Sequence, residues 1–194
     1  SELAELMGLA RSTVTLRIEA LMDLGLVGFV QDAVSTGGRP SSRIALKAGS
    51  RVVLGVDIGA SHLQVAVTDL TGHLLAQSAR ALEITQGPEA VLGAVVEIGT
   101  ELLSSTGRST SDLLAVGIGL PGPIDSRTRA LVSPSRMPCW LGLDVGAAVT
   151  AATGLPAIVD NDANLMALGE HSLLPEVYHL VFVKVGSSIG CGVI

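Results

Sequence analysis

The sequence predicts an α/β protein that is preceded by a short segment of two helices and a β-hairpin. From Val52 onward, apolar strand-like runs alternate with helical patterns, whereas residues 2–46 carry two helical patterns followed by two short strands. In addition, 48% of the 194 residues are hydrophobic and 15% are charged. Such a chain is too apolar to be disordered and has ample material for a buried core.

The composition also restricts the kind of protein. Aromatic residues make up only 2% of the chain, so the core must be built from Ala, Val, Leu and Ile. No apolar run reaches the roughly 18 residues of a membrane helix, and the first residues show no leader pattern. We expect a soluble cytoplasmic protein with no membrane partner and no metal site in this chain. The cysteines and histidines show no ligand spacing. Cys139 and Cys191 are expected to have a structural packing role, and the four histidines are expected at surface or packing positions (His62, His73, His171 and His179).

The first segment begins with two helical patterns, residues 2–8 and a second pattern that ends at Gly25. The apolar residues of the second pattern recur at helical spacing and are expected to face inward (Val14, Ile18, Leu21 and Leu24). Residues 26–30 and 43–46 are predicted strands, joined by a polar, glycine-rich tip. The order is therefore helix, tight turn, helix and hairpin.

This order is typical of a DNA-reading module, because a short turn lets the second helix reach base edges in the major groove. Residues 1–51 hold six basic and five acidic residues, whereas residues 52–194 hold six basic and thirteen acidic ones. The outward positions of the second helix and the hairpin tip supply the expected DNA contacts (Arg11, Ser12, Thr13, Thr15, Arg17 and Arg39). The alternative is a helical hairpin that merely packs and leaves its arginines solvated.

The remaining chain reads as an α/β domain. Three strands in succession, followed by alternating helices and strands, indicate a mixed sheet. The predicted strands and helices, in order, are strands 52–56, 62–68 and 73–77, helix 88–106, strand 113–119, helix 143–153, strand 157–159, helix 163–171, and strands 178–185 and 189–194.

Two glycine-containing turns are candidate phosphate sites. The first follows a buried strand, where a carboxylate can hold Mg²⁺ and a glycine allows close approach of a phosphate (Asp57, Gly59 and Ser61). The second lies between the last two strands and resembles the second phosphate loop of the actin-like sugar kinases (Gly186, Ser187, Ser188 and Gly190). Taken alone, an ordinary turn and a plain hairpin explain them equally well.

A polar pair follows the strand at residues 157–159. Asn161 can both donate and accept hydrogen bonds, and Asp162 can take a hydroxyl proton, which suits a sugar. The alternative is helix capping, because Asn and Asp favour helix starts for purely structural reasons. From the residues alone, sugar binding and helix capping are equally well supported.

The motifs together resemble the ROK family of repressors and sugar kinases. LAELMGLARSTVTLRIEALMDLGLV followed by TGGRPSSRIAL resembles the winged helix of bacterial repressors, and NDAN followed by GE matches the family's sugar-binding segment. The resemblance implies a winged helix-turn-helix over residues 1–47 and a ribonuclease-H-like domain of the actin/hexokinase type over residues 52–194. Because the chain starts on a helix and stops within a strand, both ends read as truncated.

The resemblance also implies roles for individual residues. Asp162 matches the catalytic base of the kinases, and the sugar is expected to contact Asn161, Asp162, Ser135 and Gly122. One departure is Ala10, where relatives often carry a serine that caps the recognition helix. Others are Ala60-Ser61-His62 and Ser187-Ser188, where kinases usually show Gly-Thr-Lys and a Gly-Thr-Gly loop; these changes indicate degraded nucleotide binding.

We therefore expect a sugar-responsive repressor, working as a homodimer or homotetramer on palindromic operator DNA, with a sugar or sugar-phosphate effector. No cofactor is visible, and a structural zinc of the family type would lie beyond Ile194. The first alternative is an ATP- and Mg²⁺-dependent sugar kinase that carries a DNA-binding head. The second is a regulator that has lost its sugar site and answers to a partner protein.

Overall fold

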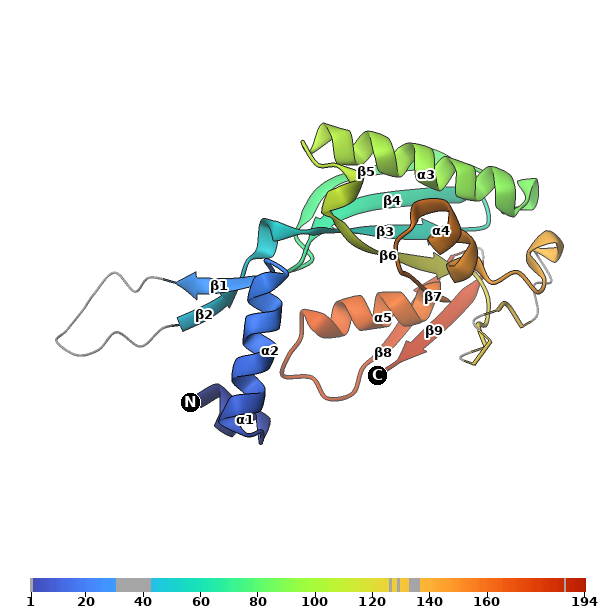
Figure 1. The fold of residues 1–194 in the computed structure, drawn as a ribbon. Helices are drawn as coiled ribbons and strands as arrows, with labels where there is room; N and C mark the ends of the chain where they lie inside the picture. The colour runs from blue at the N-terminus through green and yellow to red at the C-terminus, as the bar shows by residue number, and fades with distance from the viewer. Residues whose placement is uncertain (1, 31–42, 126, 129, 133–136, 187) are drawn as a thin grey trace.

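The structure, a computed structural model, describes residues 2–30, 43–125, 127–128, 130–132, 137–186 and 188–194 (Figure 1). Three residues with a predicted role, Arg39, Ser135 and Ser187, lie outside this part of the chain. Among the described residues, no helix combines the length and apolarity needed to cross a lipid bilayer.

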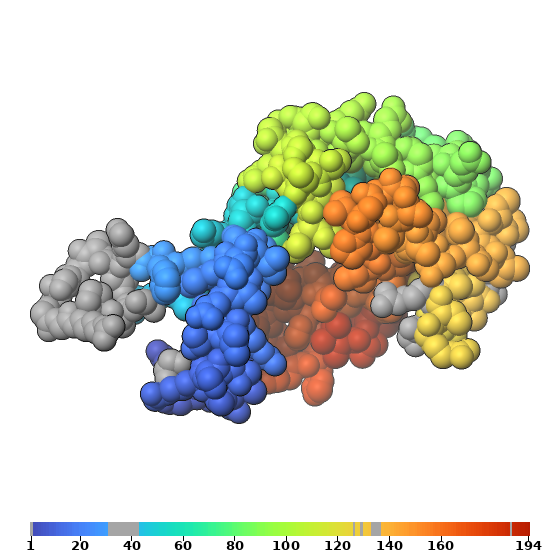
Figure 2. Space-filling view, viewed as in Figure 1, coloured from blue at the N-terminus to red at the C-terminus, as the bar shows by residue number. Residues whose placement is uncertain are grey.

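Residues 2–30 and 43–46 form two helices and an antiparallel pair of strands, in the order that the sequence predicts. Helix α1 spans Glu2–Met7, and α2 spans Arg11–Asp23. Strand β1 (Val27–Val30) pairs with β2 (Arg43–Leu46). We call these four elements the head. Figure 2 shows its helices as a lobe beside the rest of the molecule, and the hairpin points away from that body in Figure 1.

The head buries little of its apolar surface. Val14 is buried and Ile18 half-buried, as expected, but Leu21 and Leu24 are exposed, so the predicted inward face of α2 is wrong beyond its first two turns. Thr13, expected to point outward, is half-buried beside Val14. Two short helices have too little facing surface to cover a full apolar stripe.

The body of the molecule is built on a sheet of five strands, which is mixed, as predicted; the last two predicted strands form a separate two-stranded sheet. Its strands are β3 (Val52–Ile58), β4 (His62–Asp69), β5 (Leu74–Ala81), β6 (Leu113–Leu120) and β7 (Ala157–Asn161). The spatial order is β5-β4-β3-β6-β7, in which β3, β6 and β7 run parallel while β4 and β5 are antiparallel to their neighbours. The carboxyl ends of the three parallel strands therefore meet at one edge of the sheet.

Helices cover both faces of this sheet. Helix α3 (Pro88–Ser105) connects β5 to β6, and α4 (Val145–Thr153) connects β6 to β7. Helix α5 (Asp162–Ser172) follows β7 and packs on the β8–β9 hairpin, strands Val181–Val185 and Ile189–Val193. In Figure 1, α3 and α5 lie on opposite sides of the sheet. Short 3₁₀ turns cover Ala48–Ser50, Ile84–Gln86, Thr110–Asp112 and Pro138–Trp140.

The main core lies between the sheet and helices α3 and α4. It is aliphatic, as predicted, with Trp140 and Met137 as its two exceptions. Trp140 is completely buried, and its indole Nε1 donates a hydrogen bond to the carbonyl of Ile84 at 3.1 Å. This tryptophan is thus a core residue, which fits the requirement that a buried indole N–H find an acceptor.

The connection between the head and the sheet is fixed by hydrogen bonds. Arg108 donates to the carbonyl of Gly49 at 2.7 Å, and the backbone N–H of Leu70 donates to the carbonyl of Ala48 at 3.1 Å. Strand β3 begins two residues after the 3₁₀ turn at Ala48–Ser50 and runs from this connection to Asp57 at the opposite end of the sheet.

Candidate functional site

A cavity of about 750 Å³ lies at the edge where the parallel strands end. Ligands of open α/β sheets bind at this edge, beyond the carboxyl ends of the strands. The cavity is lined by the turn between β3 and β4, the loop after β6, the start of α5 and the β8–β9 hairpin.

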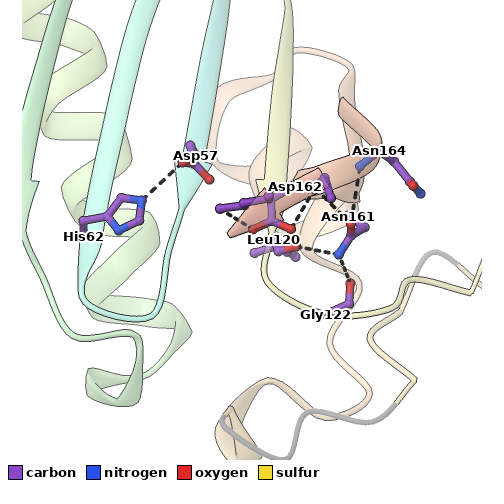
Figure 3. A network of polar contacts seen from close by, with 9 residues as sticks. Asp57, His62, Leu120, Gly122, Asn161, Asp162 and Asn164 are labelled. Atoms are coloured by element: carbon purple, nitrogen blue, oxygen red, sulfur yellow. Dashed lines mark hydrogen bonds and ion pairs between the residues drawn. The ribbon is translucent and has the colours of Figure 1, made fainter. Parts of the chain in front are cut away.

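The structure brings most of the residues predicted to bind a sugar or phosphate to this one cavity; Asp57 is not among its lining residues. Its lining includes residues from both candidate phosphate turns and from the candidate sugar segment (Gly59, Ser61, Gly122, Asn161, Asp162, Gly186, Ser188 and Gly190). Figure 3 shows Asp57 at the end of β3 and Asp162 at the start of α5 on the same side of the sheet.

The side chain of Asn161 is held by the protein itself. Its Oδ1 accepts hydrogen bonds from the backbone N–H groups of Ala163 and Asn164, which makes it the N-cap of α5. Its Nδ2 donates to the carbonyl of Gly122 at 2.9 Å (Figure 3). Gly122 has a φ of 146°, a backbone conformation that favours glycine. Asn161 therefore caps a helix and ties it to the loop after β6, so that α5 and this loop form one wall of the cavity.

Asp162 is the one buried charged residue among those described, and it has a cationic partner that the sequence analysis missed. Its Oδ1 accepts the backbone N–H of Ala163 at 2.8 Å, and its Oδ2 lies 2.7 Å from Nζ of Lys184 on β8. A signal existed in the sequence: Lys184 is the single lysine after Lys47, and it sits in an otherwise apolar strand.

Asp57 is also paired with a basic side chain. Nε2 of His62, on β4, lies 3.2 Å from Oδ2 of Asp57 (Figure 3). Oδ1 of Asp57 is buried and has no hydrogen-bond partner among the described residues. The sequence predicts a packing or surface position for His62, and its side chain is indeed exposed. It also lines the cavity, which the sequence analysis did not predict, because β4 starts beside the end of β3.

The turn at Asp57–Ser61 does not fit a nucleotide phosphate in this arrangement. The imidazole of His62 rests directly on Gly59, where even an added Cβ would overlap the ring. A phosphate bound to a glycine turn needs that same space to reach backbone N–H groups.

The glycines of the β8–β9 hairpin have a packing role. A Cβ at Gly190 would press on the side chain of Ala163, and one at Gly192 would overlap the backbone of Ala163 and the side chain of Ala167. These glycines let α5 lie directly on β9. The packing role expected for the cysteines is wrong, because Cys139 and Cys191 are both exposed, and Cys191 lines the cavity.

Replacing Gly192 with Ala is expected to lower the free energy of unfolding by about 2 kcal/mol, because the added methyl group forces α5 away from β9. Urea denaturation followed by circular dichroism measures the change. Gly93→Ala is the matched control: nothing lies within 4 Å of its added Cβ on helix α3, so this substitution should stabilise the protein by up to about 1 kcal/mol. Equal effects of the two substitutions would contradict the packing argument.

The carboxylate of Asp125, in the loop after β6, accepts hydrogen bonds from the residues that follow it. Hydrogen bonds from the backbone N–H groups of Thr128 and Arg127 to its carboxylate lower the pKa of Asp125 below its usual value. The carboxylate therefore accepts backbone hydrogen bonds in the manner of an Asx turn. Within the described residues, no group of three or more His, Cys, Asp or Glu side chains is arranged to hold a metal ion.

The comparisons with known proteins agree with this architecture. The sequence model of the ROK family matches residues 53–194. The xylose repressor of Bacillus subtilis is 26% identical over 196 residues, which cover 100% of this chain and 50% of that protein. The glucokinase of Streptomyces coelicolor is 30% identical over 145 residues, which cover 74% of this chain and 43% of that protein. The chain spans about half the length of the repressors it matches.

Solved structures show the same pattern. A ROK family transcriptional regulator described as a homolog of the E. coli MLC protein superposes with a TM-score of 0.77 at 25% identity, over 99% of this chain and 49% of that chain. A ROK family glucokinase from Streptomyces griseus, in complex with glucose and AMPPNP, superposes with a TM-score of 0.63 at 26% identity, over 74% of this chain and 44% of that one. With the family match spanning the sheet, the cavity and the hairpin, this chain belongs to the ROK family.

Proposed function

We propose that the protein is a sugar-responsive transcriptional repressor that binds operator DNA through its head and a sugar through the cavity. One observation carries the proposal. The xylose repressors and the ROK transcriptional regulator align with 99–100% of this chain, head included, whereas the glucokinases align with 74%. A cytoplasmic location accompanies this function.

In this proposal the head is a winged helix-turn-helix over residues 1–47, separate from the sensing domain over residues 52–194. Helix α2 is the recognition helix and the β1–β2 hairpin is the wing. The side chains of Arg11, Ser12, Thr15 and Arg17 are exposed on α2, as base and phosphate contacts require. Arg39 would add a contact from the wing tip. A symmetric dimer would place two heads on the two halves of a palindrome.

The sensing half uses the cavity at the strand ends. Hydroxyl groups of a sugar both donate and accept hydrogen bonds, and Asp162 with its neighbours offers both partners. D-xylose is the first sugar to test, because the repressors that align with the whole chain are named for it. Binding changes operator affinity only if the sugar prefers one arrangement of the heads.

A sugar kinase with a DNA-binding head is the second candidate, and Asp162 is the observation in its favour. The residue follows β7 and faces the cavity where a kinase would need a base for the sugar hydroxyl. Two contacts weigh against this function: Asp162 Oδ2 already accepts a hydrogen bond from Lys184, and His62 covers Gly59. For these reasons we rank the repressor first.

Replacing Arg11 or Arg17 with Ala is expected to weaken operator binding about 10-fold or more, since each loses a base or phosphate contact. The full-length protein would first select its operator from a random DNA library. Fluorescence anisotropy with that duplex then gives the Kd of each variant.

The matched control is Arg80→Ala, which removes an arginine of the body that pairs with Glu97 at 2.9 Å. Its operator Kd should equal that of the wild type. If the Arg11, Arg17 and Arg80 variants all bind operator as tightly as the wild type, α2 is not the recognition helix.

A further inference from the structure

We propose that Lys184 is a ligand-binding residue of the cavity, and that Lys184 and Asp162 together bind neighbouring hydroxyl groups of a neutral monosaccharide. This inference rests on the proposed sugar-sensing function and deepens it. It concerns a residue that stands outside the recognised sugar segment, on strand β8 of the hairpin that packs against α5.

Geometry places the ammonium group in the cavity and fixes it there. Lys184 projects from β8, in the hairpin that packs on α5, and its Nζ lies 2.7 Å from Oδ2 of Asp162. Both residues line the cavity, and the exposed fraction of the side chain is 28% for Lys184 and 11% for Asp162. An ion pair held between two packed elements keeps its geometry better than one between mobile surface side chains.

Counting hydrogen bonds shows what the pair still offers. A lysine ammonium has three donors, and the described residues use one of those of Lys184, for Asp162. The carboxylate of Asp162 accepts one hydrogen bond at each oxygen, from Ala163 and from Lys184, and each oxygen keeps a second lone pair. The pair therefore presents unused donors beside unused acceptors.

A diol satisfies this combination. One hydroxyl group can donate to Asp162 while the neighbouring one accepts from Lys184, and adjacent hydroxyls on a sugar ring have the required spacing. The two charges cancel, and a second carboxylate at this edge, Asp57, is paired with His62. A phosphorylated or acidic sugar would bring a further negative charge next to two carboxylates. The occupant we assign is a neutral sugar.

The test is calorimetric titration of the full-length protein with D-xylose, D-glucose and N-acetyl-D-glucosamine, in wild-type and Lys184→Met forms. Methionine keeps the length and apolar stem of lysine but removes the donors. Lys184→Met should weaken the best-binding sugar about 10-fold or more, the usual effect of losing a charged hydrogen bond. Lys47→Met, which removes a lysine from the end of the head, should bind the sugar like the wild type.

Monodeoxy forms of the best-binding sugar separate direct contact from a structural role. Removal of the hydroxyl that Lys184 contacts should weaken binding to the wild type but cause little further loss in Lys184→Met, because the contact is already gone. Lys184→Arg keeps a cation near Asp162, so removal of the same hydroxyl should still weaken sugar binding to this variant. This variant replaces Lys184→Met in the test if the methionine variant does not fold.

The outcomes separate the two proposals. If the wild type binds a sugar and Lys184→Met binds it within twofold, the role of Lys184 is overturned while sugar sensing stands. The role of Lys184 is likewise overturned if each deoxy sugar shows the same fold-loss of affinity, relative to the parent sugar, in the wild type and in Lys184→Met. If the wild type binds none of the three sugars, the proposed sensing function fails, and the role of Lys184 falls with it.

Discussion

Asp162→Asn is expected to weaken sugar binding about 100-fold, the largest effect of any single substitution in the cavity. Asparagine can still accept the backbone N–H of Ala163, so the start of α5 should persist. Its amide nitrogen, however, replaces an acceptor with a donor that faces the ammonium of Lys184 and the sugar. The loss of a charged hydrogen bond, together with the unpaired ammonium, accounts for a change of this size.

Asp160→Asn is the matched control for this substitution. Asp160 lies two residues away and does not itself line the cavity, and its Oδ1 accepts hydrogen bonds from the backbone of Asn161 and the side chain of Asn164, which do. Calorimetric titration should give a sugar Kd for Asp160→Asn close to that of the wild type. Equal losses in both variants would mean that disturbance of the α5 start, rather than contact with the ligand, explains the result.

Trp140→Ala is expected to lower the free energy of unfolding by about 4 kcal/mol. The indole is completely buried, and its removal leaves a large hole and an unpaired carbonyl at Ile84. Ile84, which accepts the indole hydrogen bond, and Met137 line the cavity, so the same substitution should weaken sugar binding indirectly. Urea denaturation followed by far-ultraviolet circular dichroism is the suitable measurement, since Trp140 is the single tryptophan of the chain.

Trp140→Phe tests the cause of this loss. Phenylalanine restores most of the apolar volume but not the hydrogen bond to Ile84, so it should cost about 2 kcal/mol less than alanine. A loss below about 1 kcal/mol for Trp140→Ala would show that the core does not depend on this side chain.

Most of the fold could be predicted from local patterns. The mixed sheet follows from three strands in succession and then alternation, and the predicted helix at residues 88–106 ends within one residue of α3. The prediction for strand β5 is too short, covering residues 73–77 instead of Leu74–Ala81. The second half of β5 is a mainly exposed edge with weak alternation, and only pairing with β4, up to His62 and Ala81, extends it.

The site is harder to predict, because its key contacts join distant segments. Asp162 and Lys184 are 22 residues apart and meet only when the β8–β9 hairpin packs on α5. From the sequence, sugar binding and helix capping are equally good interpretations of Asn161. In the structure, the hydrogen bonds of Asn161 identify it as the cap of α5. Asp57 and His62 are five residues apart, yet their contact depends on the tight turn from β3 to β4. Local propensity contains no information on such pairs.

The most direct test of the account is a sugar titration of the operator complex formed by the full-length protein. With D-xylose, D-glucose and N-acetyl-D-glucosamine as probes, we expect one of them to change the operator Kd at least 10-fold, with saturation, and the change to disappear in Asp162→Asn. ATP turnover is measured on the same samples. An operator Kd that stays constant with all three sugars, or sugar-dependent ATP turnover that Asp162→Asn abolishes, would contradict the account.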